Sequence, residues 1–148
     1  MPAGLLSLSA EGARRTMALL WLGFFLVNLG MAFYLYFGGW IEQDNFKASV
    51  SQLNSSYVPY IGVILAYYLT ERRRTTSKSG RAGMPFAVAL LSSLVWNAMV
   101  FLFMGRVVLL QGAIENSIRD IADFCPLLSW LVAPAIGFYF AKSSLSGR

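Results

Sequence analysis

The sequence predicts an all-α membrane protein with four transmembrane helices. Hydrophobic residues make up 57% of its 148 residues and charged residues only 13%, whereas a soluble domain carries roughly 25% charged residues. Four long runs lack any charged residue, and they cover residues 16–41, 48–70, 82–105 and 124–141. A spanning helix needs about 20 apolar residues. Lipid is therefore the expected solvent for these runs.

We expect one domain, residues 1–148, because the chain is short. Its predicted spans cover about residues 17–40, 57–71, 84–105 and 125–141. The second span is the shortest because serine, glutamine and asparagine are frequent before Tyr57. A basic loop at 71–83 and outer segments at 41–56 and 106–124 connect the spans. None of the runs alternates strictly between polar and apolar residues, so helices are predicted rather than a barrel.

The loop charges predict that both termini are cytoplasmic. The side that holds the termini and the loop 71–83 carries nine basic and two acidic residues. The opposite side carries three basic and five acidic residues, and the two sides together account for all 12 basic and 7 acidic residues. Cytoplasmic loops of membrane proteins are enriched in Lys and Arg. An N-in/C-in topology follows.

Aromatic residues gather at the predicted span ends, as in an interfacial belt. They are Tyr34, Tyr36 and Trp40 after the first span, Tyr57 and Tyr60 at the start of the second, and Tyr67 and Tyr68 at its end.

The two halves of the chain resemble each other and favour a tandem two-helix repeat, with chance alignment of apolar segments as the alternative. Ser49 corresponds to Ser117, 68 positions later, and Pro59 and Pro126 each open a return helix. Both halves start on the same side, so the repeat is parallel. If it is real, Asn28 and Asn97 lie at similar depth.

Both outer segments are predicted to be amphipathic helices. In the second, one helical face holds Val107, Leu110, Ile114, Ile118 and Ile121. This segment either continues the third span outward or lies on the outer leaflet. Phe46, Val50 and Leu53 form a weaker apolar face in the first segment.

Asn28 and Asn97 are the candidate functional residues inside the spans. A buried amide is costly unless it is hydrogen-bonded, so each faces another helix or a polar cavity. Contact between helices is the simpler interpretation, and a pore-lining or substrate-facing pair is the functional one. Pro134 lies inside the fourth span, where it predicts a kink or a gating hinge.

The loop between the second and third spans is a candidate docking surface. Its basic residues are Arg72, Arg73, Arg74, Lys78 and Arg81. Such a cluster attracts anionic lipid, and an acidic cytoplasmic protein is the alternative partner. Direct binding of nucleic acid is not expected, because no supporting motif accompanies the cluster.

The missing residue types argue against an enzyme. The chain has no histidine, and Cys125 is its only cysteine, so the common zinc and haem sites have too few ligands. Apart from Glu71 at the end of the second, no predicted span contains Asp, Glu, Lys or Arg. We therefore expect no catalytic residues, no metal and no cofactor.

The end of the second span reads Tyr67-Tyr68-Leu69-Thr70-Glu71-Arg72-Arg73-Arg74. In topology the chain is similar to GtrA-like proteins, four-helix proteins associated with polyprenyl-linked sugars, and it keeps their basic end here without their asparagine. In size, N-in/C-in topology and basic cytoplasmic face it also resembles the small four-helix membrane subunits of bacterial antiphage defence systems, the Kiwa-type membrane component. The resemblance implies a bacterial inner membrane.

The sequence thus predicts a non-enzymatic homo-oligomeric sensor, scaffold or channel-like component that recruits a cytoplasmic partner. The alternative is a small transporter or lipid-linked substrate flippase, with a polar cleft lined by Asn28, Asn97, Ser92 and Ser93.

Overall fold

The computed structural model describes residues 10–71, 84–110 and 112–141. They form four long helices: α1 (Ala10–Phe37), α2 (Gln43–Glu71), α3 (Met84–Leu110) and α4 (Ile114–Ala141). No strand occurs within these described ranges. The all-α prediction is confirmed.

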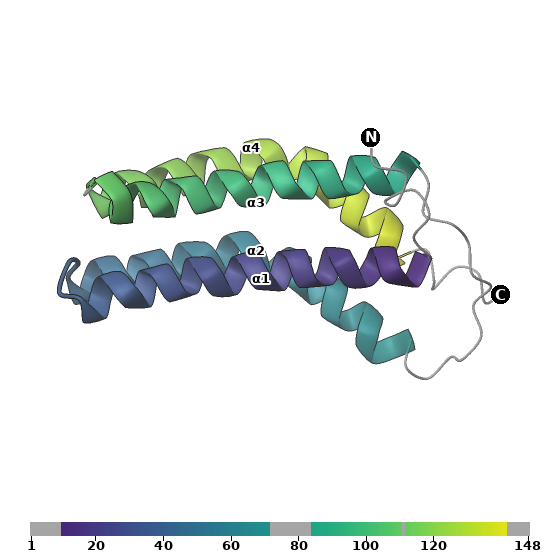
Figure 1. Ribbon diagram of the computed structural model, residues 1–148, viewed down its shortest axis with the longest axis horizontal. Helices are drawn as coiled ribbons and strands as arrows, with labels where there is room; N and C mark the ends of the chain where they lie inside the picture. Colours follow the sequence, from purple (N-terminus) through teal and green to yellow (C-terminus); the bar gives the residue numbers. More distant parts are fainter. Residues whose placement is uncertain (1–9, 72–83, 111, 142–148) are drawn as a thin grey trace.

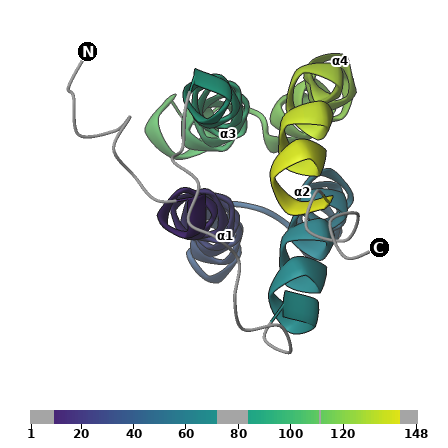
Figure 2. The ribbon, with the colours of Figure 1, turned by 90° about the vertical axis from the view of Figure 1, so that its right-hand side faces the viewer.

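The helices form a four-cornered bundle in which each helix packs against two neighbours (Figures 1 and 2). α1 contacts α2 and α3, and α4 contacts α2 and α3. α1 and α3 run in one direction, and α2 and α4 run back. The ends of α1 and α3 and the starts of α2 and α4 therefore lie at one end, called here the hairpin end. The opposite end, where α1 and α3 begin and α2 and α4 finish, is the terminal end.

Three of the helices are long and apolar enough to cross a membrane, over Glu11–Phe37, Phe86–Leu110 and Ile114–Gly137. α2 is equally long but does not reach the same apolar content, because its first half is rich in polar residues. The described residues thus support a membrane-spanning protein with three apolar helices.

The predicted outer segments are not separate elements. Residues 43–56 belong to the same helix as the second span, because Ser49 and Leu53 are buried in the bundle and tie this stretch to its neighbours. The second segment follows neither predicted arrangement, since α3 ends at Leu110 and α4 begins at Ile114. The apolar face predicted across this region is therefore shared between two antiparallel helices.

Gly39 ends α1 in a compact turn. Its φ is +73°, a conformation that glycine adopts without steric cost. The Trp40 amide donates to the Leu35 carbonyl over 2.9 Å, and the Gly39 amide donates to that of Tyr36 over 3.1 Å. This is the Schellman pattern, which satisfies the last carbonyls of a helix and lets the chain reverse into α2.

Three prolines lie inside helices, whereas Pro85 lies in the first turn of α3. Pro59 is inside α2, and Pro126 and Pro134 are inside α4, so the expectation that Pro59 and Pro126 open the return helices is wrong. α2 and α4 both bend in their second halves (Figure 1). Proline removes a backbone donor and clashes with the preceding turn, which accounts for the bends. A gating role for Pro134 stays a prediction.

Large apolar side chains cover much of the outer surface of the bundle. Fully buried side chains include Trp21, Leu35 and Ile64, while Trp130 is 71% exposed and Leu102 is 67% exposed. Large apolar side chains are exposed on all four helices. Water does not solvate so extensive an apolar surface in a stable monomer, whereas hydrocarbon does.

We predict that Trp21→Ala destabilises the bundle much more than Trp130→Ala. Both substitutions remove an indole, but only Trp21 is fully buried, and emptying such a site costs roughly 3–5 kcal/mol. Thermal unfolding of the detergent-solubilised protein measures the difference. Equal losses for the two variants would contradict the placement of these side chains.

Candidate functional site: the polar and aromatic core layer

Four aromatic rings meet across the axis of the bundle, where they form the core ring cluster. Trp21 comes from α1, Tyr57 and Tyr60 come from α2, and Trp96 comes from α3. The ring-centroid distances of the contacting pairs run from 4.7 Å for Trp21–Tyr60 to 5.8 Å for Trp21–Tyr57. Trp96 touches Tyr57 on the diagonally opposite helix at 5.0 Å. The cluster therefore fills the centre of the bundle.

The fourth helix joins the cluster through its backbone. The Trp96 indole N–H donates to the Cys125 carbonyl of α4 over 3.4 Å. Cys125 is a buried free thiol, and the buried Ser56 hydroxyl of α2 is its hydrogen-bonding neighbour. All four helices thus contribute to one packed layer.

Asn28 bonds α1 to α2 beside the core ring cluster. Its side-chain amide nitrogen donates to the Tyr57 hydroxyl over 3.1 Å and to the Phe24 carbonyl over 2.8 Å. Asn28 is completely buried, as its position in an apolar run predicts. The contact with Tyr57 matches the interpretation of Asn28 as a bond between helices.

Asn97 is equally buried but bonds only within its own helix. Its amide nitrogen donates to the Ser93 carbonyl over 2.8 Å. Its side-chain oxygen has no hydrogen-bond partner among the described residues. The same holds for the side-chain oxygen of Asn28, the Trp21 indole nitrogen, and the hydroxyls of Ser93 and Ser117. Unpaired buried polar atoms are costly, so the interior of the bundle is more polar than packing requires.

The two asparagines lie at different depths. Trp21 contacts Trp96, 75 positions later, and Phe24 contacts Phe101, 77 positions later. Asn97 follows Asn28 by only 69 positions. With about 1.5 Å per helical residue, the two amides are offset along the bundle on the order of 10 Å. This offset weighs against the equal depth that a repeat implies, and the repeat itself stays a prediction.

Polar contacts tie the helices together at the hairpin end. The Arg106 guanidinium lies 3.3 Å from the Asp120 carboxylate, and the Asn45 amide donates to Glu115 over 2.6 Å. A crevice of about 500 Å³ lies beside these contacts, lined by residues that include Trp40 and Glu115. It is open and peripheral, and neither Asn28 nor Asn97 lines it.

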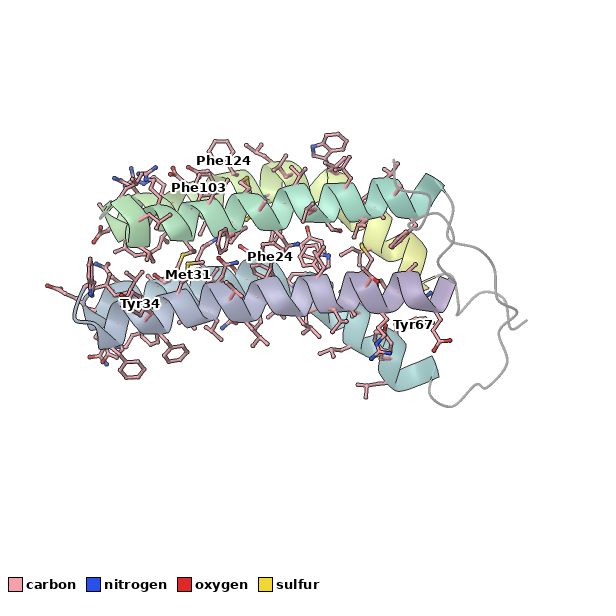
Figure 3. The ribbon with its side chains drawn as sticks, in the orientation of Figure 1. Phe24, Met31, Tyr34, Tyr67, Phe103 and Phe124 are labelled. Carbon is pink, nitrogen blue, oxygen red and sulfur yellow. The ribbon has the colours of Figure 1, made fainter. Side chains whose placement is uncertain are left out.

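An arginine–tyrosine contact ties α1 to α2 at the terminal end. The Arg14 guanidinium donates to the Tyr67 hydroxyl and lies 4.8 Å above the Tyr67 ring. The Tyr67 ring in turn contacts Phe140 of α4 at 5.3 Å. Figure 3 shows Tyr67 between α1 and the bent half of α2, and Phe24 and Met31 between α1 and α3.

The aromatic belt prediction is wrong for Tyr57, which lies at the centre of the bundle, and a second tyrosine of the belt is buried between helices. Tyr57 is fully buried and Tyr67 is 6% exposed, because each bonds a polar group of α1. Tyr57 is thus a site residue that the sequence did not indicate, since an aromatic residue near a span end is equally typical of an anchor. Trp40 is 52% exposed at the hairpin end, as an interfacial residue requires.

The predicted docking residues Arg72, Arg73, Arg74, Lys78 and Arg81 lie outside the described residues. Pro134 is exposed on α4, away from the core ring cluster. Within the part of the chain that the structure describes, no group of three His, Cys, Asp or Glu side chains is arranged to hold a metal ion.

No protein-family model matches the chain, and neither the curated proteins nor the solved structures include a match. The fold and the site therefore show the structural class of the protein and no family. It is a helical bundle with three helices apolar enough to cross a membrane and a core layer closed by four aromatic rings.

We predict that replacing Asn28 lowers the stability of the bundle much more than replacing Asn97. Asn28→Leu removes the partner of a buried hydroxyl and costs roughly 1–3 kcal/mol. Asn97→Leu removes an amide that bonds only its own helix and leaves stability nearly unchanged. Chemical or thermal unfolding in detergent compares the two variants.

A double-mutant cycle checks the cause. Tyr57→Phe added to Asn28→Leu is expected to cost less than Tyr57→Phe alone, because the shared bond is already lost. Additive losses would show that the bond between the two side chains does not stabilise the fold.

Proposed function

We propose that the protein is a non-enzymatic, homo-oligomeric component of a bacterial inner membrane. It crosses the bilayer four times, with both termini and the loop 71–83 in the cytoplasm. It works as a sensor, scaffold or channel-like component that recruits a soluble partner. The hairpin end is then the outer end, and the terminal end is cytoplasmic.

The core ring cluster is the observation that carries this proposal. Trp21, Tyr57 and Trp96 are each at most 1% exposed and fill the axis of the bundle. A substrate path through a single copy would run along this axis, where the rings leave it no room. Function through the outer surfaces, by contact with other copies and with a partner, agrees better with a closed interior.

The contacts at the two ends support the proposed orientation. Arg14 packs against Tyr67, an arrangement typical of a membrane interface, where long basic side chains and tyrosines lie side by side. The acidic groups Asp44, Glu115 and Asp123 are exposed near the hairpin end. The side that the proposal places outside is thus the acidic one.

A small transporter or flippase is the second candidate, and one observation favours it. The side-chain oxygens of Asn28 and Asn97 and the Ser93 hydroxyl are buried without partners among the described residues. Such groups are available to a polar substrate if the bundle opens. This candidate predicts movement of a lipid-linked substrate in reconstituted vesicles and loss of that movement in Asn97→Leu.

Neutralising the cytoplasmic arginines tests the proposal. We expect the triple variant Arg72→Gln, Arg73→Gln, Arg74→Gln to lose its co-purifying cytoplasmic protein, because the loop loses three of its positive charges. The matched triple Lys variant keeps the charges and is expected to keep the partner. Affinity purification from native membranes, followed by mass spectrometry, measures this.

A topology control and a test of the oligomer complete the experiment. Protease access to a C-terminal tag in intact cells shows whether the Gln variant keeps its topology. The proposal fails if the wild-type protein is monomeric in nanodiscs and brings down no partner.

A further inference from the structure

The outer half of the bundle has faces of different polarity at the same depth. Asn28 of α1 is hydrogen-bonded to Tyr57 of α2. Asn54 is three residues nearer the hairpin end, so it lies level with about position 31 of α1. Beyond that level, Phe33 and Phe37 of α1 are still 41% and 79% exposed. The exposed apolar side chains Phe33 and Phe37 of α1 thus lie nearer the hairpin end than the exposed polar side chain Asn54 of α2.

α3 repeats the pattern of α1. Its last residues, Leu109 and Leu110, are 81% and 74% exposed. On α2, by contrast, the exposed residues from the start of the helix to this depth include Asp44, Lys47, Ser51, Asn54 and Ser55. A bilayer offers the same solvent to every face at a given depth. At least one of these faces therefore meets something other than lipid.

The polar face of α2 carries hydrogen-bonding groups without partners in the bundle. The Asn54 amide makes no hydrogen bond within the described residues, and neither does the Ser51 hydroxyl. Pro59 lacks the N–H that the Ser55 carbonyl would accept from in a regular helix. These three groups form the α2 polar patch. At the depth of the α1 apolar surface they cannot remain unpaired in lipid without cost.

We propose that the α2 polar patch packs against the same patch of a second copy of this chain. The interface lies around a two-fold axis along the membrane normal. This inference rests on the proposed oligomer and names its contact surface. Two copies in one membrane hold the patch at one depth, so each group meets its own counterpart.

The chemistry of the patch suits a copy of itself. An amide and a hydroxyl each donate and accept, so Asn54 can bond to Asn54 of the other copy or to the Ser55 carbonyl, which has no N–H of Pro59 to accept from. The small exposed residues Ala48, Ser51 and Ser55 allow two helices to approach closely.

Cysteine cross-linking in native membranes tests this interface. In a Cys125→Ser background, which has no other cysteine, we expect Ser51→Cys and Asn54→Cys to give a dimer with a short bifunctional thiol reagent. Leu26→Cys on α1 and Leu102→Cys on α3 are the matched controls. These positions are 61% and 67% exposed on the faces assigned to lipid, and we expect no dimer from them.

The same variants separate this inference from the proposed function. Dimers from the control positions but not from Ser51→Cys or Asn54→Cys would overturn the α2 interface and leave the oligomer in place. A monomer by native mass spectrometry would overturn both. If a different protein is cross-linked at these two positions, the second copy is the wrong occupant.

Asn54→Leu gives an independent readout that does not depend on thiol geometry. It removes the polar contact but adds apolar surface that lipid solvates. We expect the dissociation constant of the dimer in detergent to rise about tenfold. An unchanged or tighter dimer would contradict a hydrogen-bonded interface at this residue.

Discussion

The contact between Trp21, Tyr57, Tyr60 and Trp96 holds the bundle together at its centre. These rings come from three helices, and the Trp96 indole reaches the backbone of the fourth. Aromatic pairs at such distances contribute beyond the area they bury. In a membrane, where lipid is as apolar as the core, helices associate through packing and hydrogen bonds rather than by escaping water. The remaining helix contacts depend on this cluster for their register.

One buried amide sets how two of the helices are oriented around the packed rings. Asn28 bonds Tyr57 and so fixes the rotation of α1 against α2, much as a single buried asparagine sets the register of a coiled coil. Asn97 has no such contact with another helix among the described residues. The two asparagines, which are alike in sequence context, therefore differ in their contacts: Asn28 bonds a neighbouring helix, and Asn97 bonds within its own helix.

Much of the fold was predictable from the sequence, but the site was predictable only in part. The uncharged runs identified the helices, and the cost of a buried amide identified Asn28 and Asn97 as interior. The role of Tyr57 was not predictable, because lipid and core are both apolar and no periodicity shows which way a span residue points. The continuity of α2 was missed for the opposite reason. Its polar residues favour a separate outer segment, while buried Ser49 and Leu53 keep this stretch in the bundle as part of α2.

Quenching of tryptophan fluorescence by brominated lipids tests the central claim most directly. Single-tryptophan variants, with phenylalanine at the other positions, report Trp21, Trp96 and Trp130 separately. The closed bundle in lipid predicts strong quenching of Trp130 by bromine at the middle of the acyl chain, and protection of Trp21 and Trp96 from both lipid bromine and aqueous iodide. Quenching of Trp21 or Trp96 by iodide would show that water enters the axis, and it would contradict the account.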